Sequence, residues 1–249
     1  MLVRQSKNTF IRHYDDEGYI TNQMTRHDRS YNETGSDFLK EITRQPRDVE
    51  DIVNHLSEIY DDSVSREELK QDFIEFIQDL ADHKFLVVGN TPEELDASDL
   101  DFSYSMENPK TLADDFTQET TQKVRETTQD HNLEAAQRKP RIASIQFELT
   151  SRCNERCIHC YIPNAKKNAG GDMSIEKVFS IIDEFAEMGG LHVTLSGGEV
   201  FLHKDVIRIM QYCREKDMQI SILSNLIALR DEQIPYIKAA NVSLVQTSL

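Results

Sequence analysis

The stretch Glu148-Leu-Thr-Ser-Arg-Cys153-Asn-Glu-Arg-Cys157-Ile-His-Cys160-Tyr161 is the most informative part of this chain. Its three cysteines are spaced C-x3-C-x2-C, directly after the alternating apolar segment Ile142–Leu149, which predicts a β-strand. Three thiolates on one short loop can hold three irons of a 4Fe-4S cluster and leave the fourth iron free for a substrate or cofactor. The pattern therefore indicates an iron–sulfur site at the end of a strand.

Two other uses of these cysteines compete with the iron–sulfur interpretation. A structural zinc site could take the three cysteines and His159, but zinc ligands usually come as two separated pairs, and here all four lie within eight residues. A disulfide would leave an odd cysteine, in a chain without a secretory signal. Cys213 falls on the apolar face of a predicted helix, which favours a buried thiol over a cluster ligand.

Two further motifs follow strand-like segments downstream. The segment Leu195-Ser-Gly-Gly-Glu-Val-Phe-Leu202 comes after the apolar strand Leu191–Leu195, and its glycines let a ligand approach the backbone closely. The strand Gln219–Asn225 ends in Ser224 and Asn225. Ligands of parallel α/β folds collect at the carboxyl ends of strands, although an ordinary turn would explain this serine and asparagine equally well.

The cysteine spacing and the Gly-Gly-Glu segment together resemble the radical S-adenosylmethionine (radical SAM) enzymes. The resemblance implies a 4Fe-4S cluster with three ligands, which are Cys153, Cys157 and Cys160. It also implies S-adenosyl-L-methionine, bound by its methionyl end at Gly197, Gly198 and Glu199, with the glutamate meeting the amino group. An electron donor such as flavodoxin or ferredoxin is the expected redox partner.

Other cofactor contacts follow from the same resemblance. In the family, polar residues after the third strand touch the ribose or carboxylate of the cofactor, so Ser224 and Asn225 are candidates. His159 stands at a position that is usually aromatic and lies beside the adenine. Tyr161 either lines the same pocket or simply packs. The resemblance assigns no residue of this chain a catalytic acid–base role.

Strands and helices alternate between the motifs. Apolar residues at helical spacing predict a helix from Ile175, with Ser174 as its N-cap and Gly189-Gly190 as its end. Further helices are expected near 204–216 and 231–239, followed by a fourth strand at Val242–Leu249. The order predicts parallel βαβ units, an incomplete radical SAM (βα)6 partial barrel with strands 1 to 4. We expect a carboxyl-terminally truncated enzyme. With only Cys213 outside the motif, this chain has too few cysteines for an auxiliary cysteine-ligated cluster of its own.

The first ninety residues predict a separate, winged-helix-like α+β unit. Apolar alternation gives three strands, and apolar stripes of 3.6-residue period give three helices, the third opening with a capping-box pattern. A final apolar run closes the unit. The elements expected are strands Thr9–Tyr14, Tyr19–Met24 and Arg29–Glu33, helices around Phe38–Ile42, Val49–Tyr60 and Ser65–Leu80, and the run Lys84–Gly89.

This order of elements resembles the PqqD-like domain that recognises leader segments of ribosomally made peptides. The resemblance implies that the leader adds a strand beside the third strand and packs against the third helix. It places the peptide-binding groove at Arg29, Tyr31, Phe73 and Ile77, although most apolar residues of that helix are expected in the core. A DNA-binding winged helix is the competing interpretation, but the unit lacks a basic recognition helix.

Residues 91–139 differ from both flanking units. The stretch 91–135 holds twelve acidic residues against three basic ones, which predicts an acidic flexible linker that tethers the leader-binding domain near the catalytic core. The net charge of −16 argues against nucleic acid or an anionic membrane as a partner. Neither a signal peptide nor an apolar run long enough to span a bilayer is present, so we expect a cytoplasmic protein.

The sequence thus predicts a radical SAM peptide maturase with a PqqD-like domain at 1–90, a linker at 91–139 and a radical SAM core at 140–249. The resemblance implies that cleavage of S-adenosylmethionine yields a 5′-deoxyadenosyl radical, which removes hydrogen from a carbon of the core peptide. A thioether cross-link is the first expectation, with carbon–carbon cross-linking or epimerisation as alternatives. A fragment that binds a leader peptide without catalysis is the competing class.

Overall fold

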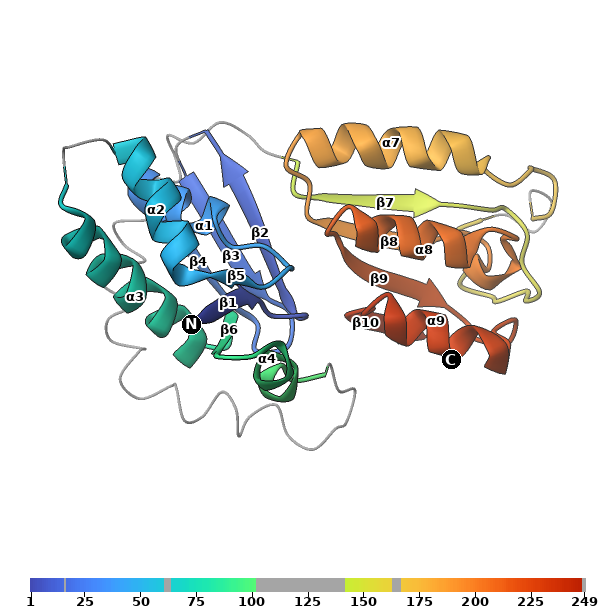
Figure 1. Ribbon diagram of the computed structural model, residues 1–249. Coiled ribbons are helices and arrows are strands. Elements are labelled where there is room, and N and C mark those ends of the chain that lie inside the picture. The colour runs from blue at the N-terminus through green and yellow to red at the C-terminus, as the bar shows by residue number, and fades with distance from the viewer. Residues whose placement is uncertain (16, 61–63, 102–141, 163–166, 248–249) are drawn as a thin grey trace.

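The computed structural model describes residues 1–15, 17–60, 64–101, 142–162 and 167–247. It shows two units, one formed by residues 1–101 and the other by residues 142–247 (Figure 1). Most of the expected linker, residues 102–139, lies outside the described part of the chain. Within the described part, no helix is both long and apolar enough to cross a bilayer.

An antiparallel sheet forms one side of the amino-terminal unit. It contains β2 (Thr9–Tyr14), β3 (Glu17–Asn22) and β4 (His27–Tyr31), in the order β2-β3-β4. The three expected strands are confirmed, but the third ends before Glu33. Asn32 is the reason, because its side chain accepts a hydrogen bond from the Gly35 amide and so begins a helix. Strand β4 is an edge strand of this sheet.

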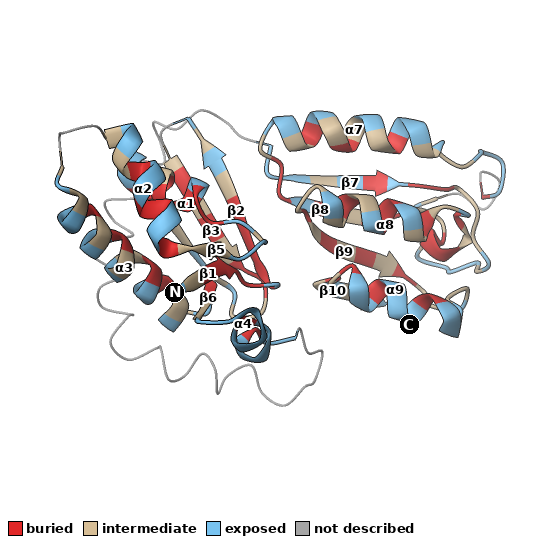
Figure 2. Ribbon diagram, viewed as in Figure 1, coloured by how far each residue is buried: buried red, intermediate tan, exposed pale blue. Residues whose placement is uncertain are grey.

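Three helices pack on the strands. They are α1 (Glu33–Lys40), α2 (Val49–Tyr60) and α3 (Arg66–Asp82), in agreement with the apolar stripes of the sequence. The expected N-cap of α3 is confirmed, since the Ser65 side chain accepts a hydrogen bond from the Glu68 amide at 3.2 Å. In Figure 2 the buried residues lie where these helices face the strands, and this is the core of the unit.

A second small sheet joins the two ends of this unit. Strand β1 (Leu2–Gln5) lies between β5 (Arg47–Asp48) and β6 (Leu86–Gly89), in the order β5-β1-β6. Strand β6 matches the expected closing run, whereas β1 was not expected. Its Arg4 interrupts the apolar pattern, yet this residue is only 7 % exposed because its guanidinium donates to Asp99 at 2.5 Å.

Helix α4 (Pro92–Ser98) lies inside the stretch expected to be a linker. The Thr91 side chain caps it by accepting from the Glu94 amide at 3.3 Å. Asp99 follows the helix and is buried, accepting hydrogen bonds from Arg4 and from the Ser6 hydroxyl. The prediction that the linker begins at residue 91 is therefore wrong. The composition of this segment predicts that it is solvated, yet its Asp99 is buried as the partner of Arg4.

The carboxyl-terminal unit is built on a parallel four-stranded sheet in the order β10-β9-β8-β7. Its helix α8 lies between α7 and α9 (Figure 1). The expected alternation of strands and helices is confirmed. In chain order, with two 3-10 turns, the elements are β7 (Ser144–Glu148), α7 (Ile175–Glu187), β8 (His192–Ser196), η2 (Val200–Leu202), α8 (Val206–Glu215), β9 (Gln219–Ser224), η3 (Asp231–Gln233), α9 (Ile234–Ala239) and β10 (Leu244–Thr247).

Two details of this unit agree with the sequence. The Ser174 side chain accepts a hydrogen bond from the Lys177 amide at 3.3 Å, so Ser174 is the N-cap of α7. Cys213 on α8 is completely buried among apolar residues, and this burial raises the pKa of its thiol to about 12. A core role for this cysteine is thereby confirmed.

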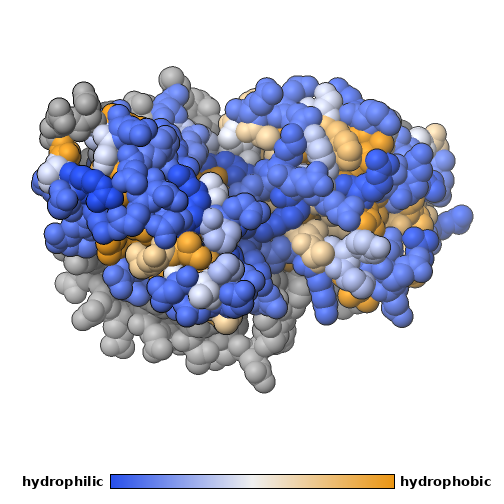
Figure 3. Space-filling model, in the orientation of Figure 1, coloured by the Kyte–Doolittle hydropathy of each residue, from blue (hydrophilic) through white to orange (hydrophobic). Residues whose placement is uncertain are grey.

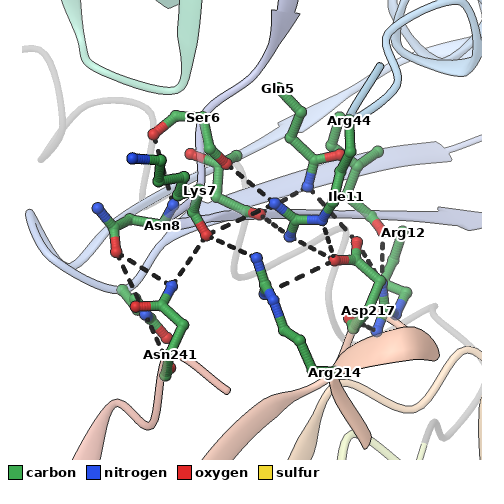
Figure 4. A network of polar contacts seen from close by, with 12 residues as sticks. Gln5, Ser6, Lys7, Asn8, Ile11, Arg12, Arg44, Arg214, Asp217 and Asn241 are labelled. Atoms are coloured by element: carbon green, nitrogen blue, oxygen red, sulfur yellow. Dashed lines mark hydrogen bonds and ion pairs between the residues drawn. The ribbon is translucent and has the colours of Figure 1, made fainter. Parts of the chain in front are cut away.

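The two units meet at the amino ends of the parallel strands (Figure 4). Asp217, in the turn before β9, accepts a hydrogen bond from Arg44 Nε at 2.7 Å and forms an ion pair with Arg12 at 3.6 Å. Arg12 Nε also donates to the Gly190 carbonyl just before β8, at 2.9 Å. Asn241, before β10, donates to the Lys7 carbonyl at 2.9 Å. Direct polar contacts therefore join the amino-terminal unit to all three of these strand entrances.

Candidate functional site

The cysteine loop begins where β7 ends. Leu149 N donates to the Ser196 carbonyl at 2.9 Å, so the loop leaves the sheet while it is still paired with the end of β8. Thr150 next forms a bridge to Asp172 in the segment that leads into α7. The carboxyl ends of β7 and β8 and the entrance to α7 thus fix the backbone just ahead of Cys153.

The two glycines bring the end of β8 against this loop. Gly198 N donates to the Thr150 carbonyl and Glu199 N to the Arg152 carbonyl, both at 2.7 Å. A Cβ at Gly197, whose φ is +144°, would lie 2.6 Å from the Thr150 oxygen, and one at Gly198 would lie 2.3 Å from the Arg152 oxygen. The sequence predicted close approach by a ligand, but the group that approaches here is the backbone of the cysteine loop.

Glu199 joins the ends of β8 and β9. Its side chain is buried, with Oε1 accepting from the Phe201 amide at 3.1 Å and from the Ser224 hydroxyl at 2.7 Å. Its Oε2 accepts from the Asn225 amide at 2.8 Å. The carboxylate therefore holds the serine and asparagine that follow β9. Contact between this carboxylate and the amino group of a cofactor stays a prediction.

Asn225 and Tyr161 attach the cysteine loop to its surroundings. Asn225 Nδ2 donates to Asn154 Oδ1 at 3.0 Å, between the first two cysteines. The Tyr161 hydroxyl donates to Glu148 Oε1 at 2.6 Å, and this hydrogen bond to a carboxylate is the main reason that the pKa of Tyr161 is raised to about 12. His159 is exposed. The structure thus brings Ser224, Asn225 and the glycines together with the loop, while His159 and Tyr161 lie on its outer side as exposed residues.

The three cysteines are free thiols on one loop. Cys153 and Cys160 are half-buried and Cys157 is exposed. In the described residues, no group of three or more His, Cys, Asp or Glu side chains is close enough together to hold a metal ion. The donor set still suits an iron–sulfur cluster, because the thiols are unpaired and the loop is anchored to β8 and β9 by the bonds described above.

One pair of residues that the sequence did not single out supports the loop from outside. Arg152 forms a forked ion pair with Asp172, at 3.0 Å from Nε and 2.6 Å from Nη2. The Thr150 hydroxyl donates to the same carboxylate at 2.7 Å. Burial opposes ionisation of Asp172, but these hydrogen bonds prevail and lower its pKa. The two partners are twenty residues apart, so no local motif could have indicated the pair.

A second candidate site is the edge of β4 in the amino-terminal unit. The Tyr31 ring packs edge-to-face on Phe76 of α3, with ring centroids 5.1 Å apart. Arg29 forms an ion pair with Asp79, one turn further along α3, and its guanidinium lies over the Phe85 ring. Because β4 pairs only with β3 among the described strands, its outer edge is open for an added strand.

The structure corrects part of the predicted peptide-binding groove. Phe73 and Ile77 are 0 % and 1 % exposed, so neither lines a surface groove. Both face the core because α3 turns its i, i+4 stripe toward the sheet. Phe76 stands between the two in the sequence and is half-buried beside Tyr31, which makes it the aromatic residue of α3 at the β4 edge.

Comparison with known families distinguishes the two units. Residues 147–249 match the radical SAM superfamily, from the end of β7 through β10. Residues 26–86 match coenzyme PQQ synthesis protein D (PqqD), from β4 through the first residue of β6. The expected identity of each unit is therefore confirmed, and the β4 edge and helix α3 both lie inside the PqqD match.

Curated relatives match about two fifths of the chain. The antilisterial bacteriocin subtilosin biosynthesis protein AlbA of Bacillus subtilis is 32% identical over 99 residues, which are 40% of this chain and 22% of that protein. Fe-coproporphyrin III synthase of Methanosarcina barkeri is 31% identical over 42% of this chain and 26% of its own. PqqA peptide cyclase of Rhodopseudomonas palustris is 27% identical over 42% and 28%. The matches thus span about a quarter of these relatives.

A solved structure resembles both units together. Streptococcus suis SuiB bound to precursor peptide SuiA has a TM-score of 0.54 and 15% identity, over 94% of this chain and 45% of that one. At this identity the likeness shows the fold alone. Together with the family match of residues 147–249, it confirms the expected α/β architecture, a small amino-terminal unit followed by part of a radical SAM barrel. Residues 147–249 of this chain are a radical SAM domain, and residues 26–86 are a PqqD-like domain.

Proposed function

We propose that this protein is a radical SAM enzyme that modifies a ribosomally made precursor peptide. The observation that carries the proposal is the presence, in one chain, of a radical SAM domain and a PqqD-like domain with an open strand edge. The radical SAM relatives include both a porphyrin enzyme and peptide-maturation proteins, so that domain alone does not choose the substrate. The PqqD-like domain favours a peptide.

The cofactors proposed are a 4Fe-4S cluster and S-adenosylmethionine. The thiols of Cys153, Cys157 and Cys160 would hold the cluster. Residues at the ends of β8 and β9 would bind S-adenosylmethionine, namely Gly197, Gly198, Glu199, Ser224 and Asn225, with His159 and Tyr161 near its adenine. When bound and reduced by a flavodoxin or ferredoxin, this pair would supply a carbon radical that removes hydrogen from a peptide carbon.

The residues of the chain itself prepare this site before any ligand arrives. The carboxylate of Glu199 orients the Ser224 hydroxyl and the Asn225 amide, so these groups need not reorganise when a cofactor binds. The glycine-to-loop hydrogen bonds keep the cysteine loop against β8, next to the same strand ends. The ion pair between Arg152 and Asp172 supports the loop from outside.

The leader segment of the precursor would bind at β4. An extended peptide can hydrogen-bond to the open edge of this strand and place alternate side chains toward Tyr31 and Phe76. The amino-terminal unit contacts the radical SAM domain directly, so a peptide bound at β4 would be held at a defined distance from the chemistry. The effective concentration of the bound peptide near the cysteine loop would then depend on this fixed contact between the units as well as on the linker.

We propose a thioether cross-link, between a cysteine sulfur and a carbon of another residue, as the product. The carbon would lose a hydrogen atom, which ends in 5′-deoxyadenosine, and the thiol would lose a proton. Formation of the carbon–sulfur bond would release one electron, which replaces the electron used to cleave S-adenosylmethionine. S-adenosylmethionine, which ends as 5′-deoxyadenosine and methionine, is therefore the net two-electron oxidant. The experiment is anaerobic reconstitution with iron and sulfide, followed by reaction with a cysteine-containing precursor encoded beside this gene. Formation of 5′-deoxyadenosine and loss of a pair of hydrogen atoms from the peptide are expected.

The same experiment distinguishes the alternatives. A carbon–carbon cross-link would give the same mass loss but leave the peptide thiols free to alkylate, and epimerisation would leave the mass unchanged. A reconstituted protein that binds the precursor and yields no 5′-deoxyadenosine would be a leader-binding adaptor instead. A protein that cleaves S-adenosylmethionine but ignores every peptide would contradict the proposed substrate class.

A further inference from the structure

Helix α3 carries an acidic stripe on the side that faces β4. The stripe consists of Glu68, Asp72, Glu75 and Asp79, which are exposed and stand at helical spacing, i, i+4, i+7 and i+11. Asp79 forms the ion pair with Arg29 of β4, and this contact shows which side of the helix the stripe occupies. In Figure 3 the visible surface over α3 is mostly hydrophilic. A peptide bound at the β4 edge would therefore lie beside a row of carboxylates.

Within the described residues, three of these four carboxylates lack a cationic partner. The basic residues of α3, Arg66 and Lys70, both pair with Glu50 of α2 and so point away from the stripe. In the same part of the chain, Asp79 is the one member of the stripe that forms ion pairs. Like charges three or four residues apart on a helix repel each other. A cation brought by a bound peptide would relieve this repulsion.

The centre of the stripe lies next to the aromatic pair at the β4 edge. Arg29 meets Asp79 and Tyr31 meets Phe76, so the two elements run in opposite directions and Asp72 lies past the Tyr31 end of β4. Phe76 is four residues from Asp72 on α3. At 3.6 residues per turn, these two side chains point about 40° apart and are separated by about 6 Å along the helix axis.

This separation matches the repeat of an extended peptide. Side chains on one face of a strand recur every second residue, at about 6.6 Å. A peptide that places one side chain on Tyr31 and Phe76 would therefore bring the side chain two positions away to Asp72. Glu68 and Glu75 are the i−4 and i+3 neighbours of Asp72, so the same side chain would meet three carboxylates.

We infer that the leader segment bound at β4 is basic, with a lysine or arginine two positions from an apolar residue that packs on Tyr31 and Phe76. The inference rests on the proposed binding of a leader at β4. It adds the charge of the partner, which the strand edge does not select, because ladder hydrogen bonds involve only the backbone of the peptide. Carboxylates beside the edge would attract a basic peptide and reject an acidic one.

The test selects binders of the full chain from a displayed library of random twelve-residue peptides and measures their affinities by fluorescence titration. Asp72→Lys reverses the charge at the centre of the stripe. Glu67→Lys makes the same change in net charge on the same helix, about 140° around its axis, and is the matched control. Both positions are exposed, and urea unfolding checks that both variants fold.

The net charge of −16 requires a second control, because a basic peptide could bind such a chain without a defined site. In a selected peptide, the base is therefore moved by one position. This change keeps the charge of the peptide but turns the base to the other face of the added strand.

Selected peptides should carry a lysine or arginine two positions from an apolar residue. Asp72→Lys should weaken them roughly tenfold or more, because it sets like charges against each other, while Glu67→Lys should leave affinity within about twofold. A glutamate in place of the peptide base should restore binding to Asp72→Lys. Moving the base by one position should weaken binding to the native chain.

Failure of this inference differs from failure of the proposed function. Peptides that lose affinity with Tyr31→Ala but bind Asp72→Lys as tightly as the native chain would overturn the inference and keep the β4 site. Equal losses in Asp72→Lys and Glu67→Lys, or a base that can be moved by one position without loss, would do the same. Selected peptides that ignore Tyr31→Ala would overturn the β4 site and the inference together.

Discussion

The two units present their candidate residues in different ways. In the radical SAM domain these residues come from short motifs placed directly after strands, and backbone bonds such as that from Gly198 to the Thr150 carbonyl hold them together. In the PqqD-like domain, Phe73 and Ile77 were chosen from the periodic pattern of one helix, and the structure places both in the core. A short sequence motif therefore identifies individual site residues, whereas an apolar repeat at helical spacing identifies only the helix on which they lie.

The same contrast appears in how the units are joined. The chemistry is proposed at the carboxyl ends of the parallel strands, while the amino-terminal unit contacts their amino ends. A five-residue strand such as β8 is about 17 Å long, and β4 lies on the far edge of its own sheet from β2, which carries Arg12. A precursor bound at β4 must span at least this strand length before it reaches the cysteine loop.

The largest effect is expected at the cysteine loop. Alanine at any one of Cys153, Cys157 and Cys160 should abolish cluster assembly and 5′-deoxyadenosine formation, because an iron without its thiolate is not retained. Cys213→Ala should keep the iron, since that thiol is buried in the core. Iron and sulfide assays after anaerobic reconstitution check both. Stoichiometric zinc without iron in the native protein would contradict the iron–sulfur assignment.

The next effect tests the division of α3 between core and surface. Phe73→Ala should lower the free energy of unfolding by about 3–5 kcal/mol, because it empties a fully buried site. Phe76→Ala should cost less, about 2 kcal/mol, the scale of the two aromatic pairs that Phe76 forms with Tyr31 and Phe38, but should weaken β4-binding peptides roughly tenfold. Urea unfolding and peptide titration measure the two quantities. Equal stability losses in the two variants would remove the distinction between core and groove.

Glu199→Gln is expected to disturb the hydrogen bonds that join the ends of β8 and β9. A glutamine amide cannot accept on both sides, so either the Ser224 hydroxyl or the Asn225 amide loses its acceptor. We expect cofactor binding to weaken by roughly 1.5–3 kcal/mol, with the cluster intact. Calorimetric titration of S-adenosylmethionine measures it, and Glu232→Gln on an exposed turn is the control. Unchanged affinity would mean that this carboxylate is only structural.

The smallest effect is expected at the junction. Asp217→Asn keeps the left-handed backbone, φ +54°, that asparagine tolerates, but removes the charge between Arg12 and Arg44. These pairs are partly exposed, so a loss of about 1–2 kcal/mol is expected, with separate unfolding of the two units in calorimetry. Asp183→Asn, which removes an ion pair inside one unit, should not separate them. A single transition in Asp217→Asn would show that the junction does not depend on this carboxylate.

Much of the fold follows from local signals. The alternating apolar runs predicted β2, β3, β7 and β9 closely, and the Ser65 and Ser174 caps predicted where α3 and α7 begin. Strand β1 was missed because it depends on a distant partner. Arg4 is tolerated in β1 only because Asp99, ninety-five residues away in the sequence, neutralises it. Helix α4 has a local signal, the Thr91 cap followed by Pro92, but the acidic composition of the segment led us to expect a linker.

The sequence by itself determined the chemistry that each motif can support. The sequence itself contains the spacing of the three cysteines, the two glycines and the carboxylate that follows them. Because each of these motifs comes directly after a strand of a parallel sheet, they lie at one edge of that sheet. Tertiary structure decided which groups these residues meet. It turned Phe73 inward and left Phe76 beside Tyr31, directed Glu199 to Ser224, and set Asp217 against arginines of the other unit. The physical reason is that burial and hydrogen-bond partners depend on segments far apart along the chain.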